Sequence, residues 1–275
     1  MRELTPEFLR PRLLPRQDDS HKGDYGHLLL VCGSDAYSGA AVLATGAALK
    51  SGCGLVTLHS CARALQAAVY NYPSAMLSED PAGHFSVLPS MLEKYSAIAV
   101  GPGLGQSPDT LSALQELMGA AKGAGIPMVL DADALNLIAT NPGLLTLIPE
   151  GSVMTPHAGE YRRLAGTAPA REFSARSGCV MVMKGWRSNI IAPSGDTYVN
   201  TTGNAGMAKG GSGDVLTGLV GGLLARGCDA LDAAMLGTWI HGYAGDCLSA
   251  ECTPEAYSSQ DLIGALYKGF KALSG

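Results

Sequence analysis

The segment Asn200-Thr-Thr-Gly-Asn-Ala-Gly-Met-Ala-Lys-Gly-Gly-Ser-Gly-Asp-Val-Leu-Thr-Gly218 decides the fold, because its glycine-rich loop runs directly into an apolar helix. Glycine at positions 210, 211 and 213 lets the backbone turn sharply and approach a ligand closely. Free N–H groups at the start of the helix, together with the helix dipole, form a site for an anion. We therefore expect an anion loop at Gly210, Gly211, Ser212 and Gly213 that binds phosphate.

Asp214 lies in the first turn of this helix, where the dipole favours the ionised carboxylate. A carboxylate beside a phosphate site can accept the proton of an attacking hydroxyl group. The alternative, an acidic residue that only stabilises its helix, is the more common one for an isolated Gly-Asp pair. The density of glycines and the neighbouring Lys209 favour a catalytic role here.

Two familiar nucleotide motifs are excluded. The loop is not a Walker loop, since Lys209 precedes the glycines and no Gly-x-x-x-x-Gly-Lys-Ser/Thr pattern occurs. The segment Gly101-Pro-Gly-Leu-Gly-Gln106 is not a dinucleotide fingerprint, because its sixth position is Gln and no acidic residue follows about 20 residues later at a strand end. A Rossmann dehydrogenase is therefore disfavoured, and residues 101–106 are expected to form a tight turn, either with a ligand against its backbone or without one.

Short apolar runs bounded by Gly or Pro precede the loop and are typical of buried strands. Strands are expected at His27–Cys32, Leu55–His59, Ala97–Val100, Pro127–Leu130, Ser152–Met154 and Cys179–Met183. Segments rich in Ala and Leu lie between most of them and predict helices at Gly39–Ser51, Cys61–Tyr70, Asp109–Lys122 and Asp133–Ala139. This alternation predicts a parallel sheet covered on both faces, with ligands beyond the carboxyl ends of the strands.

The pattern changes after residue 183. The segments Asn189–Ala192 and Asp196–Val199 flank Pro193-Ser-Gly195 and predict an antiparallel hairpin. Long helices are then expected at Gly213–Ala225, at Leu231–Leu248 and from near Ser258 onward. No linker or low-complexity tract divides the chain, so residues 1–275 are expected to form a single α/β domain.

Composition narrows the classes of partner. Glycine makes up 36 of the 275 residues, which is typical of an α/β protein that binds phosphate, and a net charge of -5 argues against a nucleic-acid partner. The seven cysteines are odd in number and form no CxxC pair, which suits a reducing compartment. The N-terminus lacks the apolar stretch of a signal peptide, and the longest apolar run, Val215–Ala225, is shorter than the ~20 residues of a membrane span. We expect a cytoplasmic protein without a membrane partner.

Seven segments carry a family resemblance: Ser20–Gly26, Tyr37–Ala41, Val100–Gly105, Leu130–Asn136, Thr155–Glu160, Met183–Gly185 and Asn200–Gly218. In order and content they resemble the ADP/ATP-dependent NAD(P)H-hydrate dehydratase family, a branch of the ribokinase-like superfamily. The resemblance implies a ribokinase-like three-layer sandwich with a mostly parallel central sheet and helices on both faces. It also implies a hydro-lyase that repairs metabolites: the enzyme phosphorylates the ring hydroxyl of the S epimer of hydrated NADH or NADPH, then eliminates phosphate.

The resemblance assigns roles position by position. Asp214 is implied to be the catalytic base, and Ala40, Gly103, His157 and Asp214 to line the pocket for the hydrate. The implied nucleotide-binding residues are Lys184, Gly185, Trp186, Arg187, Ser188 and Gly213; Lys184-Gly185 match by identity, and the next three residues match by position only. Glu160 stands where many ribokinase-like kinases have a carboxylate that organises magnesium, although a role at the start of a helix is an equal alternative.

The implied ligands are ADP or ATP as phosphoryl donor, Mg²⁺, NADH-hydrate and NADPH-hydrate. A homo-oligomer, specifically a tetramer, is expected from the family. The 20 residues before His21 are too few for the epimerase domain that many relatives carry, so epimerisation is expected either from a separate epimerase or without an enzyme. Two alternatives stay open: a ribokinase-like small-molecule kinase, such as a hydroxyethylthiazole kinase, and a non-catalytic adenine-nucleotide sensor.

Overall fold

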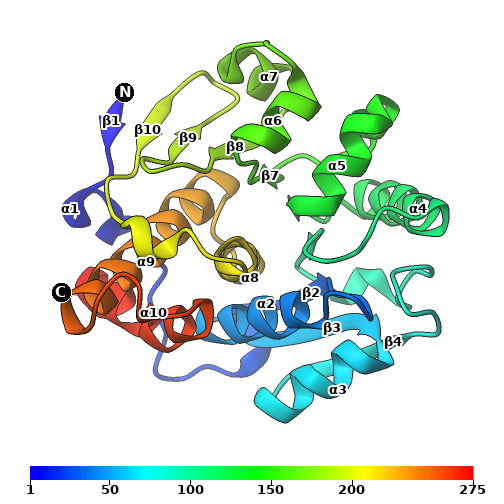
Figure 1. The fold of residues 1–275 in the computed structure, drawn as a ribbon, viewed down its shortest axis with the longest axis horizontal. Coiled ribbons are helices and arrows are strands. Elements are labelled where there is room, and N and C mark those ends of the chain that lie inside the picture. Colours follow the sequence, from blue (N-terminus) through cyan, green and yellow to red (C-terminus); the bar gives the residue numbers. More distant parts are fainter. Residues whose placement is uncertain (275) are drawn as a thin grey trace.

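A ten-stranded sheet forms the centre of the fold in the computed structural model, which describes residues 1–274 (Figure 1). The strand order is β1-β10-β9-β8-β7-β6-β5-β2-β3-β4. The strands are β1 (Arg2–Glu3), β2 (His27–Val31), β3 (Leu55–Cys61), β4 (Met76–Asp80), β5 (Ala97–Val100), β6 (Met128–Leu130), β7 (Val153–Met154), β8 (Val180–Met183), β9 (Asn189–Ile191) and β10 (Thr197–Val199). Neighbours from β8 to β4 run parallel, whereas β8, β9 and β10 pair antiparallel.

Helices cover both faces of this sheet. They are α1 (Pro6–Leu9), α2 (Ser38–Lys50), α3 (Ala62–Asn71), α4 (Pro108–Ala124), α5 (Ala132–Thr140), α6 (Ala158–Ala165), α7 (Ala170–Ser177), α8 (Ser212–Ala225), α9 (Ala230–Glu251) and α10 (Ser259–Ser274). Helices α2, α8, α9 and α10 pack in one hydrophobic core, and α4, α5 and α7 pack in the other. Alternate side chains of β2 enter opposite cores: Leu28 and Leu30 enter the first, and Leu29 and Val31 enter the second. The predicted three-layer α/β architecture is confirmed.

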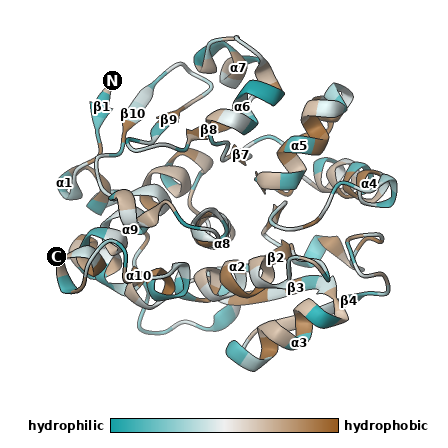
Figure 2. Cartoon of the chain, in the orientation of Figure 1, coloured by the Kyte–Doolittle hydropathy of each residue, from teal (hydrophilic) through white to brown (hydrophobic). Residues whose placement is uncertain are grey.

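Central strands such as β2 and β7 are hydrophobic, while the edge strand β1 and much of α6 are hydrophilic (Figure 2). The six predicted parallel strands and the predicted hairpin are confirmed to within two residues at each end. Strand β4 was not predicted, because its residues at 78–80 are polar and it lies at an edge of the sheet, so that no apolar run marks it. Within residues 1–274, no helix combines the length and the hydrophobicity needed to cross a membrane.

Two glycines place the glycine-rich loop above the sheet by letting α8 lie directly on α2. A Cβ atom at Gly218 would lie 2.1 Å from the carbonyl oxygen of Ala44, and one at Gly222 would lie 2.0 Å from Ser51 Oγ. Any side chain at either position would therefore force the two helices apart. The contact brings the first turn of α8 beside the start of α2, at the carboxyl ends of the parallel strands.

Candidate functional site

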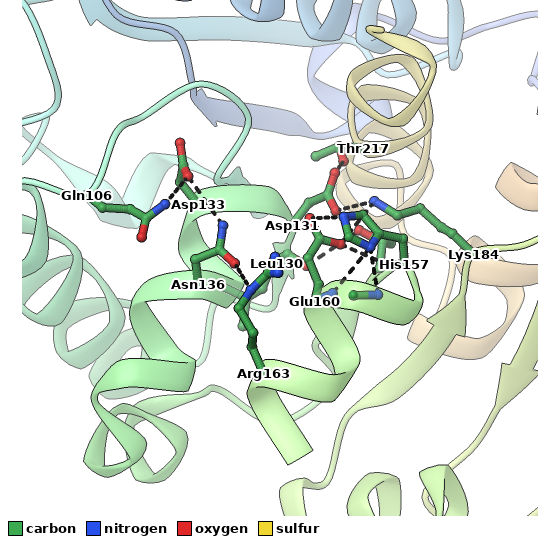
Figure 3. Close-up of polar contacts among 12 residues, drawn as sticks. Gln106, Leu130, Asp131, Asp133, Asn136, His157, Glu160, Arg163, Lys184 and Thr217 are labelled. Atoms are coloured by element: carbon green, nitrogen blue, oxygen red, sulfur yellow. Dashed lines mark hydrogen bonds and ion pairs between the residues drawn. The ribbon is translucent and has the colours of Figure 1, made fainter. Parts of the chain in front are cut away.

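An ion pair between the ends of two strands forms the base of the site (Figure 3). Asp131 follows β6 and is 1% exposed, and Lys184 follows β8; the distance between Lys184 Nζ and Asp131 Oδ1 is 2.6 Å. Thr217 on α8 donates its hydroxyl hydrogen bond to the other carboxylate oxygen, Oδ2, over 2.7 Å. Both oxygens of Asp131 thus have partners, as a buried carboxylate requires.

Lys184 remains a cation in this setting. Burial opposes its charge, but the carboxylates of Asp131 and Glu160 outweigh burial and raise the pKa of Lys184 above its usual range. A Cβ atom at Gly213 would lie 3.5 Å from Lys184 Nζ, so the ammonium group sits beside the first turn of α8 with no side chain between them. Lys184 therefore adds positive charge to the helix N-terminus, where an anion is already favoured.

Asp214 lies in the first turn of α8, but its pKa shifts opposite to the direction that the helix dipole predicts. Burial raises the pKa of Asp214 to about 6, the nearby Asp131 carboxylate adds to the rise, and Lys184 opposes it. Desolvation and a second carboxylate therefore outweigh the helix dipole in setting this pKa. A carboxylate with a pKa just below neutral is mostly ionised at pH 7 and well matched to accept a proton.

Two cavities lie on either side of this first turn. The first has a volume of about 690 Å³ and is lined by His157, Lys184, Gly185, Trp186, Ser188, the loop around Asn200–Lys209, Ser212, Gly213 and residues of α9. The second has a volume of about 420 Å³ and is lined by Ala36, Tyr37, Gly39, Ala40, Leu43, Gly103, Gly211 and Asp214. Ser212 and Gly213 thus face the first cavity, while Gly211 and Asp214 face the second.

This division agrees with most of the roles that the resemblance implied. Ala40, Gly103 and Asp214 meet in the second cavity, as a hydrate pocket requires. Lys184, Gly185, Trp186, Ser188 and Gly213 meet in the first, as a nucleotide pocket requires.

Two assigned residues lie elsewhere than expected. His157 lines the first cavity beside Lys184 and does not line the cavity of Ala40 and Gly103, because it belongs to the loop after β7, next to β8. Arg187 is exposed and lines neither cavity; its guanidinium carbon lies 4.9 Å from the centre of the Trp186 ring.

The anion loop is fixed from outside by contacts that the sequence analysis did not predict. Lys209 Nζ donates to the carbonyl oxygens of Pro254, Glu255 and Tyr257. The ammonium group of Lys209 thus fixes the loop against residues 254–257. Gly210 lines neither cavity, and its carbonyl oxygen accepts a hydrogen bond from Ser259 Oγ over 2.7 Å.

His157 and Glu160 form a reciprocal cap at the start of α6. His157 Nδ1 accepts hydrogen bonds from the backbone N–H groups of Gly159 and Glu160, and Glu160 Oε2 accepts the N–H of His157 over 2.8 Å. The Glu160 side chain is buried, and Oε2 lies 3.7 Å from Lys184 Nζ. Its carboxylate already has these partners, so direct coordination of a metal by Glu160 does not fit the geometry; an indirect role stays a prediction.

No group of three or more His, Cys, Asp or Glu side chains is placed to hold a metal ion anywhere in residues 1–274. The carboxylates of Asp131 and Glu160 already face Lys184, which takes the position of a cation between them. Magnesium therefore fits this site as an ion carried on the phosphates of a nucleotide, and not as an ion held by protein ligands alone.

Three residues of the site, Asp131, Thr217 and His241, were not predicted from the sequence. The position of Asp131 directly after a buried strand could have indicated a site residue. No local pattern indicates Thr217 or His241, because only packing brings them to the site. His241 on α9 lines the first cavity, with Nε2 3.4 Å from Ser212 Oγ. Burial lowers the pKa of His241 to about 4, so its ring is neutral.

The loop segment Gly203–Asn204, which forms part of the wall of the first cavity, is hydrogen-bonded to α9. The N–H of Gly203 and the side-chain amide of Asn204 donate to the two oxygens of Asp246, over 2.8 and 3.0 Å. Tyr257 donates its hydroxyl hydrogen bond to Asn204 Oδ1 over 2.6 Å. These contacts connect the loop around Asn204 to α9 and to Tyr257.

Comparisons with known proteins agree with this geometry. The model of the NAD(P)H-hydrate dehydratase family matches residues 28–268. The ADP-dependent (S)-NAD(P)H-hydrate dehydratase of Bacillus subtilis is 34% identical, with 97% of this chain and 98% of that protein covered. A crystal structure of the Bacillus subtilis ADP/ATP-dependent NAD(P)H-hydrate dehydratase, co-crystallised with ATP/Mg²⁺, superposes with a TM-score of 0.86 at 30% identity, covering 99% of this chain and 98% of that one.

A longer relative is also similar. The bifunctional NAD(P)H-hydrate repair enzyme Nnr of Moorella thermoacetica is 39% identical, with 96% of this chain but only 53% of that enzyme covered. The chain thus spans about half the length of this bifunctional relative.

Proposed function

Because the chain belongs to the NAD(P)H-hydrate dehydratase family, we propose that it dehydrates the S epimer of hydrated NADH and NADPH, with ADP or ATP as phosphoryl donor. The observation that carries this proposal is the position of Asp214 and Gly213. They are adjacent in the first turn of α8, yet Asp214 faces the cavity of Ala40 and Gly103, and Gly213 faces the cavity of Lys184. A substrate hydroxyl in one cavity and a nucleotide phosphate in the other would meet at this turn.

The reaction follows from this arrangement. Asp214 takes the proton of the ring hydroxyl, whose oxygen attacks the terminal phosphorus, and the phosphorus–oxygen bond to the remaining nucleotide breaks. The lone pair of the ring nitrogen then expels phosphate from the neighbouring carbon. Loss of a proton from the next ring carbon restores the double bond of NADH or NADPH. Phosphorylation is needed because phosphate is a much better leaving group than hydroxide.

The chain's own groups position the phosphates. Ser212 and Gly213 line the first cavity at the start of α8, and the Lys184 ammonium group lies beside Gly213, so developing negative charge meets preorganised positive charge. Magnesium on the nucleotide neutralises further phosphate charge when it is bound. Lys184 is held by Asp131, and therefore its ammonium group does not need to move during the transfer.

Several features of the wider setting are part of the same proposal. Residues 1–275 act as one catalytic domain, assemble as a homo-oligomer such as a tetramer, and work in the cytoplasm. An epimerase that acts on the same hydrates converts the R hydrate into the S epimer that this enzyme consumes. A small-molecule kinase would share the base and the anion loop, so the fate of the phosphorylated product distinguishes it from a dehydratase.

A direct assay tests the proposed activity. Purified protein with magnesium and either ADP or ATP is expected to convert hydrated NADH into a product that absorbs like NADH, with one phosphate released per molecule. Absorbance and phosphate are recorded together, with each nucleotide separately and with none as the control. Stable phosphorylation of a thiazole or pyridine alcohol without hydrate turnover would favour the kinase, and nucleotide binding without any turnover would favour the sensor.

Trp186 offers a separate test of the first cavity as the nucleotide site. Its side chain is 79% exposed and lines that cavity, whereas Trp239, the other of the two tryptophans, is buried. We expect ATP with magnesium to produce a saturable change in tryptophan fluorescence, because bound nucleotide covers the exposed indole ring. The change should be lost in Trp186→Phe while hydrate turnover persists. A full-sized signal in Trp186→Phe would show that nucleotide does not reach this ring.

A further inference from the structure

Tyr37 is the one aromatic residue among those that line the second cavity. Four of the other lining residues are Gly39, Ala40, Gly103 and Gly211, which present at most a methyl group. Asp214 is the only charged residue in the lining. A ligand in this cavity therefore meets mostly Gly and Ala residues, the Leu43 side chain, one carboxylate and one aromatic ring.

The backbone that carries Tyr37 is held on both sides. Gly33 N–H donates to the carbonyl of Pro102 over 2.8 Å, and Asp35 N–H donates to the carbonyl of Gly83 over 2.8 Å. Tyr37 N–H donates to Ser34, and the Tyr37 carbonyl accepts from Ala40 at the start of α2. The Cβ of Tyr37 is thus fixed, and its ring can move only by rotation of the side chain.

Gly103 sets the position of Tyr37 from the opposite segment. A Cβ atom at Gly103 would lie 2.7 Å from the Cβ of Tyr37 and 3.0 Å from that of Ala40. Gly103 also has a φ of 65°, a conformation that favours glycine. The loop after β5 and the start of α2 are therefore packed together without a side chain between them, and the Tyr37 ring stands beside this contact.

The Tyr37 side chain is exposed and makes no contact that would explain its presence through stability alone. It is 60% exposed, and within residues 1–274 its hydroxyl makes no hydrogen bond and its ring pairs with no other aromatic ring. A single exposed tyrosine is common, and Tyr70 on α3 is exposed to 88%. Tyr37 differs from Tyr70 because it lies in the cavity of the catalytic carboxylate, on a rigid backbone.

The chemistry of the substrate matches such a ring. A hydrated nicotinamide keeps a flat conjugated segment that joins the ring nitrogen, the remaining double bond and the carboxamide, and it carries no charge. Flat uncharged groups bind well against an aromatic face, by burial and by offset stacking. Since Asp214 must meet the ring hydroxyl, the reacting ring has to lie in the cavity that Tyr37 lines.

We propose that Tyr37 is a substrate-binding residue whose phenol ring stacks on the hydrated nicotinamide and holds the ring hydroxyl toward Asp214. This inference rests on the proposed function and goes beyond it by naming a residue that selects for the reacting ring. Tyr37 supplies the contact surface that Ala40, Gly103 and Gly211 are too small to supply.

Three variants test this role. Tyr37→Ala is expected to raise the KM for hydrate by about tenfold to hundredfold, the usual effect of removing an aromatic stacking partner. Tyr37→Phe keeps the ring and is expected to stay within about threefold of the wild type. Tyr70→Ala, the matched control for an exposed tyrosine outside both cavities, should leave the KM unchanged. The affinity for ATP, read from Trp186 fluorescence, and the melting temperature should not change in any of them.

Each outcome has a definite meaning. A wild-type KM in Tyr37→Ala overturns the inference, and so does a Tyr37→Phe variant as impaired as Tyr37→Ala, because the hydroxyl and not the ring would then matter. If the wild type binds hydrate without turning it over, the proposed function fails, and calorimetric titration of hydrate into the three variants still decides the role of Tyr37. If the wild type does not bind hydrate at all, both proposals are overturned.

Discussion

Replacement of Asp214 by Asn is expected to lower the turnover rate by about 100-fold or more, the scale of a lost general base. Asparagine keeps the size of the side chain but cannot accept the proton of the ring hydroxyl. Affinity for ATP should change little, since Asp214 faces the second cavity and Gly213 the first. Steady-state turnover and the Trp186 titration measure the two effects. Asp109→Asn, which changes an exposed acidic residue in the first turn of α4, is the matched control and should keep full activity.

Stability separates a catalytic Asp214 from one that only stabilises its helix. The pKa of Asp214 is raised to about 6 in the folded protein, so the folded state binds its proton more tightly than the unfolded state does. Its charge therefore destabilises the fold increasingly as the pH rises from the unfolded value toward 6, and fully above 6. Asp214→Asn removes that charge and should raise the melting temperature at neutral pH. A fall of ~1 kcal/mol in the free energy of unfolding, with activity preserved, would instead support the helix-stabilising role.

The same pKa predicts the pH profile of the wild type. Since only the ionised carboxylate accepts a proton, kcat/KM should fall as the pH drops through about 6. The residual activity of Asp214→Asn should lack this acidic limb. A limb that persists unchanged in the variant would assign it to another group and would remove Asp214 as the base.

Removal of the Lys184 side chain is expected to have the second large effect. Lys184→Ala leaves Asp131, which is 1% exposed, with only the Thr217 hydroxyl as a partner. Loss of one partner of a buried ion pair typically costs about 3–5 kcal/mol, so we expect the free energy of unfolding to fall by about 3 kcal/mol or more. Denaturant unfolding at neutral pH measures this loss.

Lys184→Ala should also raise the nucleotide requirement much more than the hydrate requirement, because the ammonium group lies beside Gly213 and the first cavity. The double variant Lys184→Met with Asp131→Asn is the control: it removes both charges and should recover most of the stability but not the nucleotide affinity. Lys184 lowers the pKa of Asp214, so the acidic limb of the pH profile should move to higher pH in Lys184→Ala. Equal increases in both apparent constants would contradict the division of the two cavities.

The sequence alone determined the local features of this protein. Apolar runs such as Ala97–Val100, alternating with Ala-rich helices, predicted the parallel sheet. This was possible because the hydrophobic periodicity of a strand or a helix is a property of a short stretch of sequence. The glycine-rich loop before α8 predicted an anion site, since the backbone of a helix start has the same unpaired N–H groups in any protein. Asp214 could be singled out for the same reason, by its place in the first turn.

Only the tertiary structure decided what these residues meet. Asp131 and Lys184 are 53 positions apart, and Asp131 and Thr217 are 86 apart, so no local pattern predicts their contacts. Three further features depend on distances between separate layers of the fold. They are the pKa of Asp214, the hydrogen bonds of Lys209 to the carbonyls of residues 254–257, and the place of His157 in the first cavity. Secondary-structure propensity and backbone requirements act over a few neighbouring residues, so the elements of the fold could be predicted from the sequence. Burial and electrostatic interactions act between residues that are far apart in the sequence, so the contacts and pKa values of the site residues could not.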